Sequence, residues 1–80
     1  MKAYNENHEL AAIICNQCGR VMTVQDDMVK EGVFSAACTW GYFSEKDGQV
    51  HHFDLCEDCY DEWISGFRLP VETEEQIELL

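Results

Sequence analysis

The sequence has little positive charge. Its 80 residues include 16 Asp and Glu but only 5 Lys and Arg, which gives a formal net charge of −11. A surface that binds DNA or RNA has to neutralise phosphates with Lys and Arg, so this balance argues against direct nucleic-acid binding. The same acidic excess argues against binding to an anionic membrane. We therefore expect neither partner.

Long apolar runs are also missing. The first apolar stretch, Leu10–Ile14, is five residues long, whereas a membrane-spanning helix needs roughly 18 apolar residues. Residues 1–9 are polar and do not contain the apolar segment of a signal peptide. We therefore expect a cytoplasmic protein, in which cysteine thiols remain reduced.

The short length limits the architecture. A chain of 80 residues accommodates one compact domain, which excludes a multidomain enzyme. Domains of this size bury roughly 60–65% of their unfolded surface, so they usually depend on disulfides, a metal ion or a partner subunit. The sequence contains five cysteines. Because an odd number fits a disulfide framework poorly, we favour a metal ion.

Four of the cysteines form two Cys-x-x-Cys pairs, Cys15 with Cys18 and Cys56 with Cys59, separated by 37 residues. Each pair lets two thiolates reach one ion from a single tight turn, and two pairs complete a tetrahedral sphere around Zn²⁺. We predict one structural zinc ion held by these four residues. Since four protein thiolates leave no position for water or substrate, we expect no enzymatic activity and assign no catalytic residues.

The first cysteine pair is flanked by short strand patterns. Apolar residues predict strands over 10–14 and 21–24. Gly19 follows the second thiol, where a residue that tolerates positive φ suits a zinc knuckle. Residues 26–32 are polar, and we expect a connection there with a helical turn that ends at Gly32.

A β-hairpin is predicted between the two pairs. Residues from Phe34 to Phe43 alternate in character, and Cys38 shares one face with Phe34, Trp40 and Tyr42. Asp47-Gly48 marks a turn, and residues 50–55 form the returning strand. We expect Cys38 to be a small buried apolar residue. An alternative ligand and a reactive thiol are the other interpretations.

The second cysteine pair is predicted to open a helix. After Cys56, one apolar stripe at helical spacing comprises Tyr60, Trp63, Ile64 and Phe67. Three acidic residues lie around the first turn, Asp54, Glu57 and Asp58. Their negative charge is favourable at the positive end of the helix dipole. Pro70 prevents continuation. We expect most of the aromatic side chains of hairpin and helix to pack around the metal, with one or two left for a partner.

This order suggests three segments, a polar, frayed lead-in over residues 1–9, a zinc-binding domain over residues 10–69 and an acidic tail over residues 70–80. In the tail, Thr73 and Gln76 resemble a capping box. A short terminal helix with Ile77 and Leu80 on one side is therefore an alternative to an irregular tail.

The predicted architecture is a small zinc-stabilised α+β domain with a knuckle, a hairpin and a C-terminal helix. It resembles the treble-clef zinc fingers through Cys15, Cys18 and Gly19 in the knuckle and Cys56 and Cys59 at the start of the helix. A zinc ribbon is less similar, because it uses two knuckles. Residues 13–68 are also similar to small uncharacterised zinc-finger proteins of bacteria and their phages, mainly over residues 40–44, 47–48 and 53–59. The resemblance implies a fold and a metal ion, and no catalytic residues.

Three histidines remain. His51 and His52 are neighbours on the returning strand and therefore point to opposite faces, so they do not bind one ion together. We expect His8 to lie in the polar lead-in. A ligand role for any of the three is a minor alternative, and a pH-dependent role for His52 beside Asp54 stays open.

The leading functional hypothesis is a non-enzymatic protein-interaction or regulatory module. Zinc and four thiolates change the formal charge from −11 to −13, so a basic protein partner fits the surface. One alternative is an acidic inhibitor that mimics nucleic acid in the binding groove of another protein. Another alternative is a thiol redox or metal-handling protein. Homo-oligomers fit the open hairpin edge and any surplus aromatic side chains.

Overall fold

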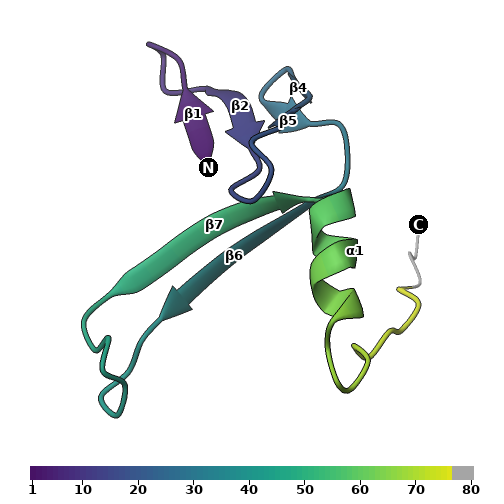
Figure 1. Ribbon diagram of the computed structural model, residues 1–80. Helices are drawn as coiled ribbons and strands as arrows, with labels where there is room; N and C mark the ends of the chain where they lie inside the picture. Colours follow the sequence, from purple (N-terminus) through teal and green to yellow (C-terminus); the bar gives the residue numbers. More distant parts are fainter. Residues whose placement is uncertain (77–80) are drawn as a thin grey trace.

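A computed structural model describes residues 1–76 (Figure 1). The chain forms three small antiparallel sheets and one helix, which confirms an α+β class. The three-stranded sheet has the order β1-β2-β3, with bounds Lys2–Tyr4, Leu10–Ile14 and Val21–Met22. Two hairpins follow, with bounds Val24–Gln25 (β4), Met28–Val29 (β5), Val33–Thr39 (β6) and Val50–Cys56 (β7). The helix α1, Glu57–Ser65, begins directly after β7.

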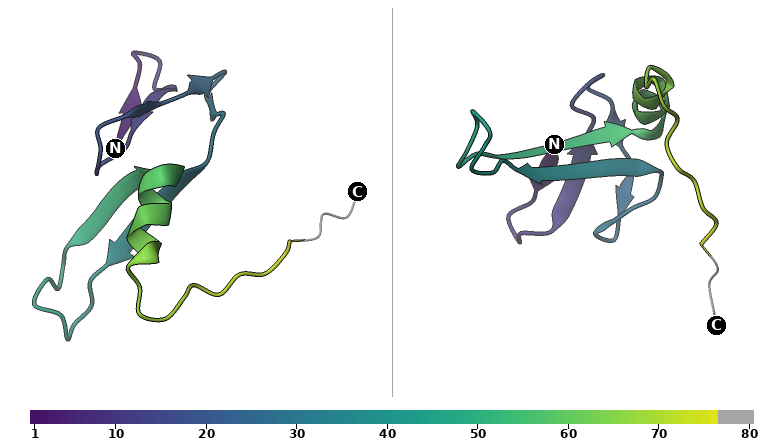
Figure 2. Two further views of the ribbon diagram at one scale, coloured as in Figure 1. Left: turned by 45° about the vertical axis from the view of Figure 1, so that its right-hand side comes forward. Right: turned by 90° about the horizontal axis from the view of Figure 1, so that it is seen from below.

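The β6–β7 hairpin contains the two longest strands, of 7 residues each. Its register pairs Val33 with Cys56 at one end and Thr39 with Val50 at the other. At the first end, which we call the base, the hairpin lies beside α1 and the short strands, whereas residues 40–49 extend away from both (Figures 1 and 2). We call residues 40–49 the tip.

The core sits at the base, and half of its residues are cysteines. Its buried apolar members are Ile13, Cys15, Met22, Leu55, Cys56 and Cys59. Beside it, one aromatic cluster joins hairpin and helix, with the Phe34 ring centroid 4.9 Å from Tyr60 and 5.8 Å from Trp63. A core this small gives a domain limited stability, so an additional link between its parts matters.

The expectation of a frayed lead-in over residues 1–9 is wrong. Residues Lys2–Tyr4 form β1, which pairs antiparallel with β2 so that Lys2 lies opposite Ile13. The backbone N–H of Ile14 donates to the Met1 carbonyl at 2.7 Å. The polar composition of this segment reflects an edge strand whose side chains are exposed.

The helical turn predicted over residues 26–32 is also wrong. This segment completes the β4–β5 hairpin, in which Val24 lies opposite Val29. Asp26 and Asp27 form the turn with φ values of 50° and 64°. Positive φ at both central residues is what a type I′ hairpin turn needs, and Asp is among the few non-glycine residues that visit this region.

The hairpin prediction is confirmed at the base and needs correction beyond Thr39. Strand β6 ends there rather than at Phe43, because residues 40–49 close through tight turns. Cys38 is exposed, so its expected burial is wrong. The side chains of Tyr42 and Phe43 are 83% and 98% exposed. These two aromatic residues do not belong to the core.

The chain after the helix is irregular as far as residue 76. Gly66 closes α1, and residues 71–76 form neither helix nor strand. The alternative of a terminal helix with Ile77 and Leu80 depends on residues outside the described ones. Within residues 1–76 we find no helix with the length and apolar character that crossing a membrane would require.

Candidate metal centre

The two Cys-x-x-Cys pairs meet at the base of the hairpin. The Sγ atoms of Cys15, Cys18, Cys56 and Cys59 all lie within 4.8 Å of one another. In a tetrahedral site with Zn–S bonds of about 2.3 Å, neighbouring sulfurs are about 3.8 Å apart. The Cys18 and Cys56 sulfurs lie 3.8 Å apart. All five cysteines fall within residues 1–76, and none is in a disulfide. The four thiols therefore form a set that can hold a metal ion.

The first pair lies in a tight turn between β2 and β3. The Cys15 N–H donates to the Arg20 carbonyl, and the Gly19 N–H donates to the Cys15 carbonyl, both at 2.9 Å. Gly19 has a φ of 80°, which a residue with a Cβ adopts at a cost. This geometry is that of the predicted knuckle. Cys15 is buried, whereas Cys18 is exposed.

The second pair spans the junction of β7 and α1. Cys56 is the last strand residue and the N-cap of the helix, and its side chain makes no capping hydrogen bond. Cys59 lies in the first helical turn. The first N–H groups of a helix have no carbonyl partner, and their partial positive charge stabilises nearby thiolates. The junction thus places Cys56 where an anionic sulfur is favoured.

The thiols differ in how readily they ionise. Burial opposes ionisation of Cys15, but backbone N–H groups of Cys18, Cys56 and Gln17 outweigh it and lower its pKa to about 6. Hydrogen bonding to the backbone of Cys59 lowers the pKa of Cys56. The pKa of Cys59 is raised, first by its hydrogen bond with Cys56 and then by burial. Ionising all four thiols together requires a cation among them, and a metal ion held by the four sulfurs would supply it.

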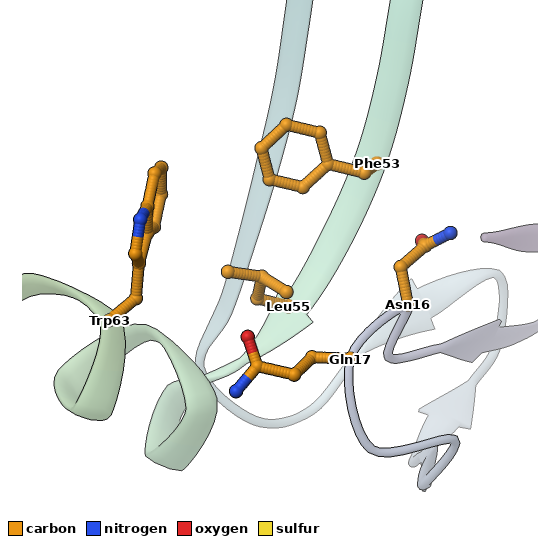
Figure 3. A pocket seen from close by; sticks show the side chains of 5 residues that line it. All are labelled: Asn16, Gln17, Phe53, Leu55 and Trp63. Atoms are coloured by element: carbon orange, nitrogen blue, oxygen red, sulfur yellow. The ribbon is translucent and has the colours of Figure 1, made fainter.

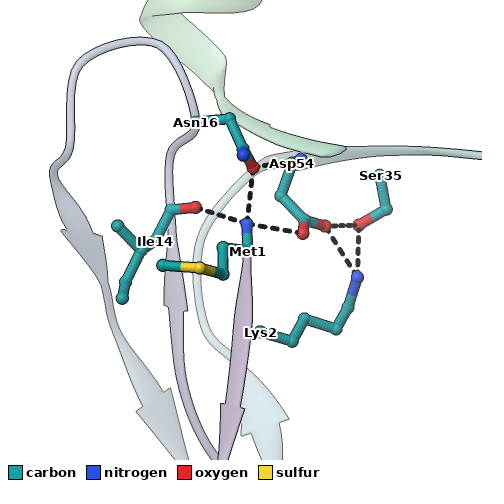
Figure 4. A network of polar contacts seen from close by, with 6 residues as sticks. All are labelled: Met1, Lys2, Ile14, Asn16, Ser35 and Asp54. Atoms are coloured by element: carbon teal, nitrogen blue, oxygen red, sulfur yellow. Dashed lines mark hydrogen bonds and ion pairs between the residues drawn. The ribbon is translucent and has the colours of Figure 1, made fainter. Parts of the chain in front are cut away.

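A buried carboxylate lies beside the second ligand pair and joins β7 to β1. Asp54 lies two residues before Cys56 and is 4% exposed. Its oxygens accept from Lys2 Nζ at 2.6 Å and from Ser35 Oγ at 2.5 Å (Figure 4). Burial alone would raise the pKa of Asp54, but hydrogen bonds from Lys2, the Met1 ammonium and Ser35 hold it well below its usual range. Asp54 is therefore ionised in the folded protein.

The Met1 ammonium group joins the same network. It donates to the Ile14 carbonyl at 2.6 Å and to Asn16 Oδ1 at 2.7 Å, and it lies 2.8 Å from Asp54 Oδ2 (Figure 4). Asn16 also bonds β7 directly, since its N–H donates to the Asp54 carbonyl and its Oδ1 accepts from the Asp54 N–H. Asn16 follows Cys15, so these bonds hold the knuckle against the strand that carries Cys56.

Sequence reasoning placed Asp54 near the start of the helix and missed this network. The available signal was a carboxylate between two apolar residues, Phe53 and Leu55, on a predicted strand. Side chains alternate between the two faces of a strand, so an acid between two apolar residues lies on the opposite face from them. If other parts of the chain cover that face, the buried carboxylate needs a cation beside it. The covering strand, β1, is distant in sequence and was not predicted.

The remaining candidate ligands lie elsewhere. His51 and His52 are on the distal half of β7 and are exposed, and His51 Nε2 lies 3.0 Å from Gln49 Oε1. His8 is exposed in the β1–β2 turn. A metal ion needs several His, Cys, Asp or Glu side chains close together. Among residues 1–76, the four cysteines are the group that meets this condition.

A shallow groove of about 320 Å³ lies beside the cysteines (Figure 3). It is lined by Asn16 and Gln17 of the knuckle, Phe53 and Leu55 of β7 and Trp63 of α1. No lining side chain carries a charge. The groove is therefore an apolar surface beside the metal centre, with amide groups on one wall.

Comparisons with protein-family models, curated proteins and solved structures give no match to this chain.

Proposed function

We propose that the chain is a non-enzymatic zinc-binding protein in which Cys15, Cys18, Cys56 and Cys59 hold one structural Zn²⁺. The convergence of four thiols within 4.8 Å carries this proposal. Four cysteine ligands are typical of closed, structural zinc sites, whereas catalytic sites keep a position for water. When bound, the ion crosslinks the knuckle to the strand–helix junction and neutralises part of the thiolate charge.

The chain's own residues prepare this site. Backbone N–H groups in the knuckle and at the helix start stabilise the thiolates. Asn16 and Asp54 hold the two ligand pairs in register, so less conformational freedom is lost when the ion binds. Metal binding then contributes folding free energy, of order 10–16 kcal/mol apparent in zinc-finger peptides, which exceeds what a core this small supplies.

The combination of knuckle, hairpin and helix-borne second pair supports a treble-clef-like zinc finger as the fold. We propose that this domain serves as a small protein-interaction or regulatory module. The support is physical: the proposed closed site has no reactive position, and the molecule presents an apolar groove and two highly exposed aromatic side chains. Such patches on a small domain mark contact surfaces.

The acidic surface supports a second candidate, an inhibitor that occupies the nucleic-acid groove of a basic protein. The exposed side of α1 carries four carboxylates: Glu57, Asp58, Asp61 and Glu62. This candidate predicts salt-sensitive binding that nucleic acid competes away. Binding that is indifferent to salt and to competitor would count against it.

The test of the zinc proposal measures metal content and folding together. We expect one zinc per chain that survives dilution and gel filtration, and loss of circular dichroism and NMR dispersion after complete chelation. Rapid alkylation of one cysteine pair in the zinc-loaded protein would instead support the thiol redox alternative. A full fold retained after complete zinc removal would overturn the structural role.

A further inference from the structure

The tip of the β6–β7 hairpin is an ordered loop that presents two aromatic side chains to solvent. The Trp40 N–H donates to the Gln49 carbonyl at 3.0 Å, and the Ser44 N–H donates to the Gly41 carbonyl at 2.9 Å. Lys46 Nζ lies 4.7 Å from the Trp40 ring centroid, and that centroid lies 5.7 Å from the ring of His51 in β7, so Trp40 anchors the loop on the hairpin. Tyr42 and Phe43 project beyond this anchor.

These two rings stay in contact with each other and not with the body of the molecule. Their centroids are 5.3 Å apart with an interplanar angle of 89°, and their exposed fractions are 83% and 98%. Adjacent exposed aromatic residues on an ordered loop form a pre-organised anchor, because little conformational freedom remains to be lost on binding. Such an anchor fits an apolar groove.

The chain itself has such a groove at the other end of the same hairpin. Its walls are Phe53, Leu55 and Trp63, together with the uncharged side chains of Asn16 and Gln17 (Figure 3). We infer that a second copy of this chain is the occupant, and that two chains form a two-fold symmetric dimer in which the Tyr42–Phe43 tip of each enters the groove of the other.

The register of the hairpin permits this closure. The groove lies at the pairs Phe34–Leu55 and Ala36–Phe53, and the tip begins beyond Thr39–Val50. In the proposed dimer, the β6–β7 hairpins of the two chains run antiparallel. The two-fold axis then passes midway between groove and tip, and this midpoint is close to the pair Cys38–His51. Cys38 is two residues beyond Ala36 on β6 and therefore faces the same side as the groove walls.

The contact area is that of a weak, reversible dimer. Burying an aromatic side chain removes roughly 150–250 Å² of surface. Two tips would then bury roughly 600–1,000 Å² of ring surface, to which the shallow grooves add less, so the interface lies at the low end of the range for specific contacts. Because neither tip rings nor groove walls carry charge, the carboxylates of both chains remain in solvent. Repulsion between two acidic chains weakens the dimer at low salt, so added salt strengthens it.

The interface rests on the folded, zinc-bound domain proposed above, so each sample is first checked for one zinc per chain. Sedimentation velocity over a wide range of protein concentration measures the association. We expect the wild type to approach twice its 9.2 kDa chain mass, with a dissociation constant that falls as salt rises. A zinc-loaded wild type that stays monomeric at every concentration overturns the interface alone, whereas a folded chain without zinc overturns the proposed site.

Two variants locate the interface. Phe43→Ser removes the anchor, and Gln17→Arg places a long charged side chain in the groove without altering a proposed ligand. Each is expected to weaken the homodimer about tenfold or more, as for the loss of a central aromatic contact. Tyr4→Ser is the matched control, because Tyr4 is 59% exposed on the other face of the hairpin, beside His52 and Asp54. It should leave association unchanged.

Mixing the two variants tests the reciprocal arrangement. The Gln17→Arg chain retains its tip and the Phe43→Ser chain retains its groove. The mixture should therefore form heterodimers with one intact contact, and it should associate more strongly than either variant alone. A short bismaleimide should join wild-type chains through Cys38, and neither Phe43→Ser nor Cys38→Ser should crosslink. Failure of the mixture to associate, or equal crosslinking in Phe43→Ser, overturns the proposed geometry.

Discussion

The two ends of the β6–β7 hairpin differ in what holds them together. At the base, the last residues of β7 are buried, the ionised Asp54 carboxylate accepts from three donors, and two cysteines of the core lie at the junction with the helix. At the tip, the loop closes on itself through backbone hydrogen bonds, and the side chains of Tyr42 and Phe43 face solvent. The comparison separates the residues that stabilise the fold from those left free for contact.

The difference follows from the position of the cysteine cluster. Because the core around it is small, the hairpin residues near the cysteines pack against the helix and the short strands, whereas the distal residues do not. Beyond Ala36 and Phe53 the hairpin leaves the helix and the short strands, so its side chains become exposed on both faces. Substitutions at the base are therefore expected to change stability, and substitutions at the tip are expected to change association.

The largest expected effect is the loss of one thiol at the base. Cys59→Ser removes a ligand and leaves a polar group in the core, so the chain should bind zinc weakly and unfold at room temperature. The binding free energy at stake is of order 10 kcal/mol in zinc-finger peptides. Zinc affinity and circular dichroism measure both consequences. Cys38→Ser is the matched control, since Cys38 is exposed, and equal losses in the two variants would contradict the assignment.

The Asp54 network comes next. Asp54→Asn removes the charge that accepts from Lys2 and the Met1 ammonium group, so two cations near the base lose their partner. We expect a loss of about 2–3 kcal/mol in the free energy of unfolding of the zinc-bound protein. Urea denaturation measures it. Asp61→Asn, on the exposed side of α1, should change stability by less than about 0.5 kcal/mol; a matching loss there would indicate a general charge effect.

The knuckle gives a smaller effect. At both Gly19 and Gly41 a Cβ would meet open space, but only Gly19 combines that space with a positive φ, of 80°. Gly19→Ala should therefore cost about 1–2 kcal/mol from backbone strain alone. Gly41→Ala should be neutral within about 0.5 kcal/mol. Thermal unfolding of the two variants separates the cost of a Cβ at positive φ from the effect of adding a Cβ at all. Equal melting temperatures would show that the positive φ of Gly19 is not required.

The tip should contribute least to the stability of a single chain. Phe43→Ser leaves the Trp40 anchor and all core contacts intact, so we expect less than about 0.5 kcal/mol change at protein concentrations where the chain is monomeric. Leu55→Ala at the base is the contrasting variant, with an expected cost of about 2–5 kcal/mol. If Phe43→Ser unfolds the monomer as much as Leu55→Ala does, the separation of base and tip is wrong.

Local patterns predicted most of the base. The spacing of the cysteines placed four thiols together, and the helical stripe after Cys56 predicted α1, because both signals are confined to a few neighbouring residues. The network around Asp54 depends instead on contacts between distant residues. Lys2 meets Asp54 across 52 positions, and nothing near either residue indicates the partner.

The remaining errors have local physical causes. The alternation of apolar residues continues to Phe43 in the sequence and predicts a strand with one buried face. The chain turns after Thr39 instead, so the residues beyond it lie in a loop. The same cause misplaced Cys38. In residues 26–32, polar character suggested a connection, whereas two Asp residues with positive φ formed a hairpin turn. Composition alone does not distinguish these outcomes.

The central claim is that zinc binding folds the base of the hairpin. Amide hydrogen exchange of the zinc-loaded and fully chelated protein tests it most directly, because protection is read residue by residue. The account predicts slow exchange for Ile13, Cys15, Met22 and residues 53–64 with zinc, and loss of that protection after chelation. Unchanged protection of these amides after complete removal of the metal would contradict it.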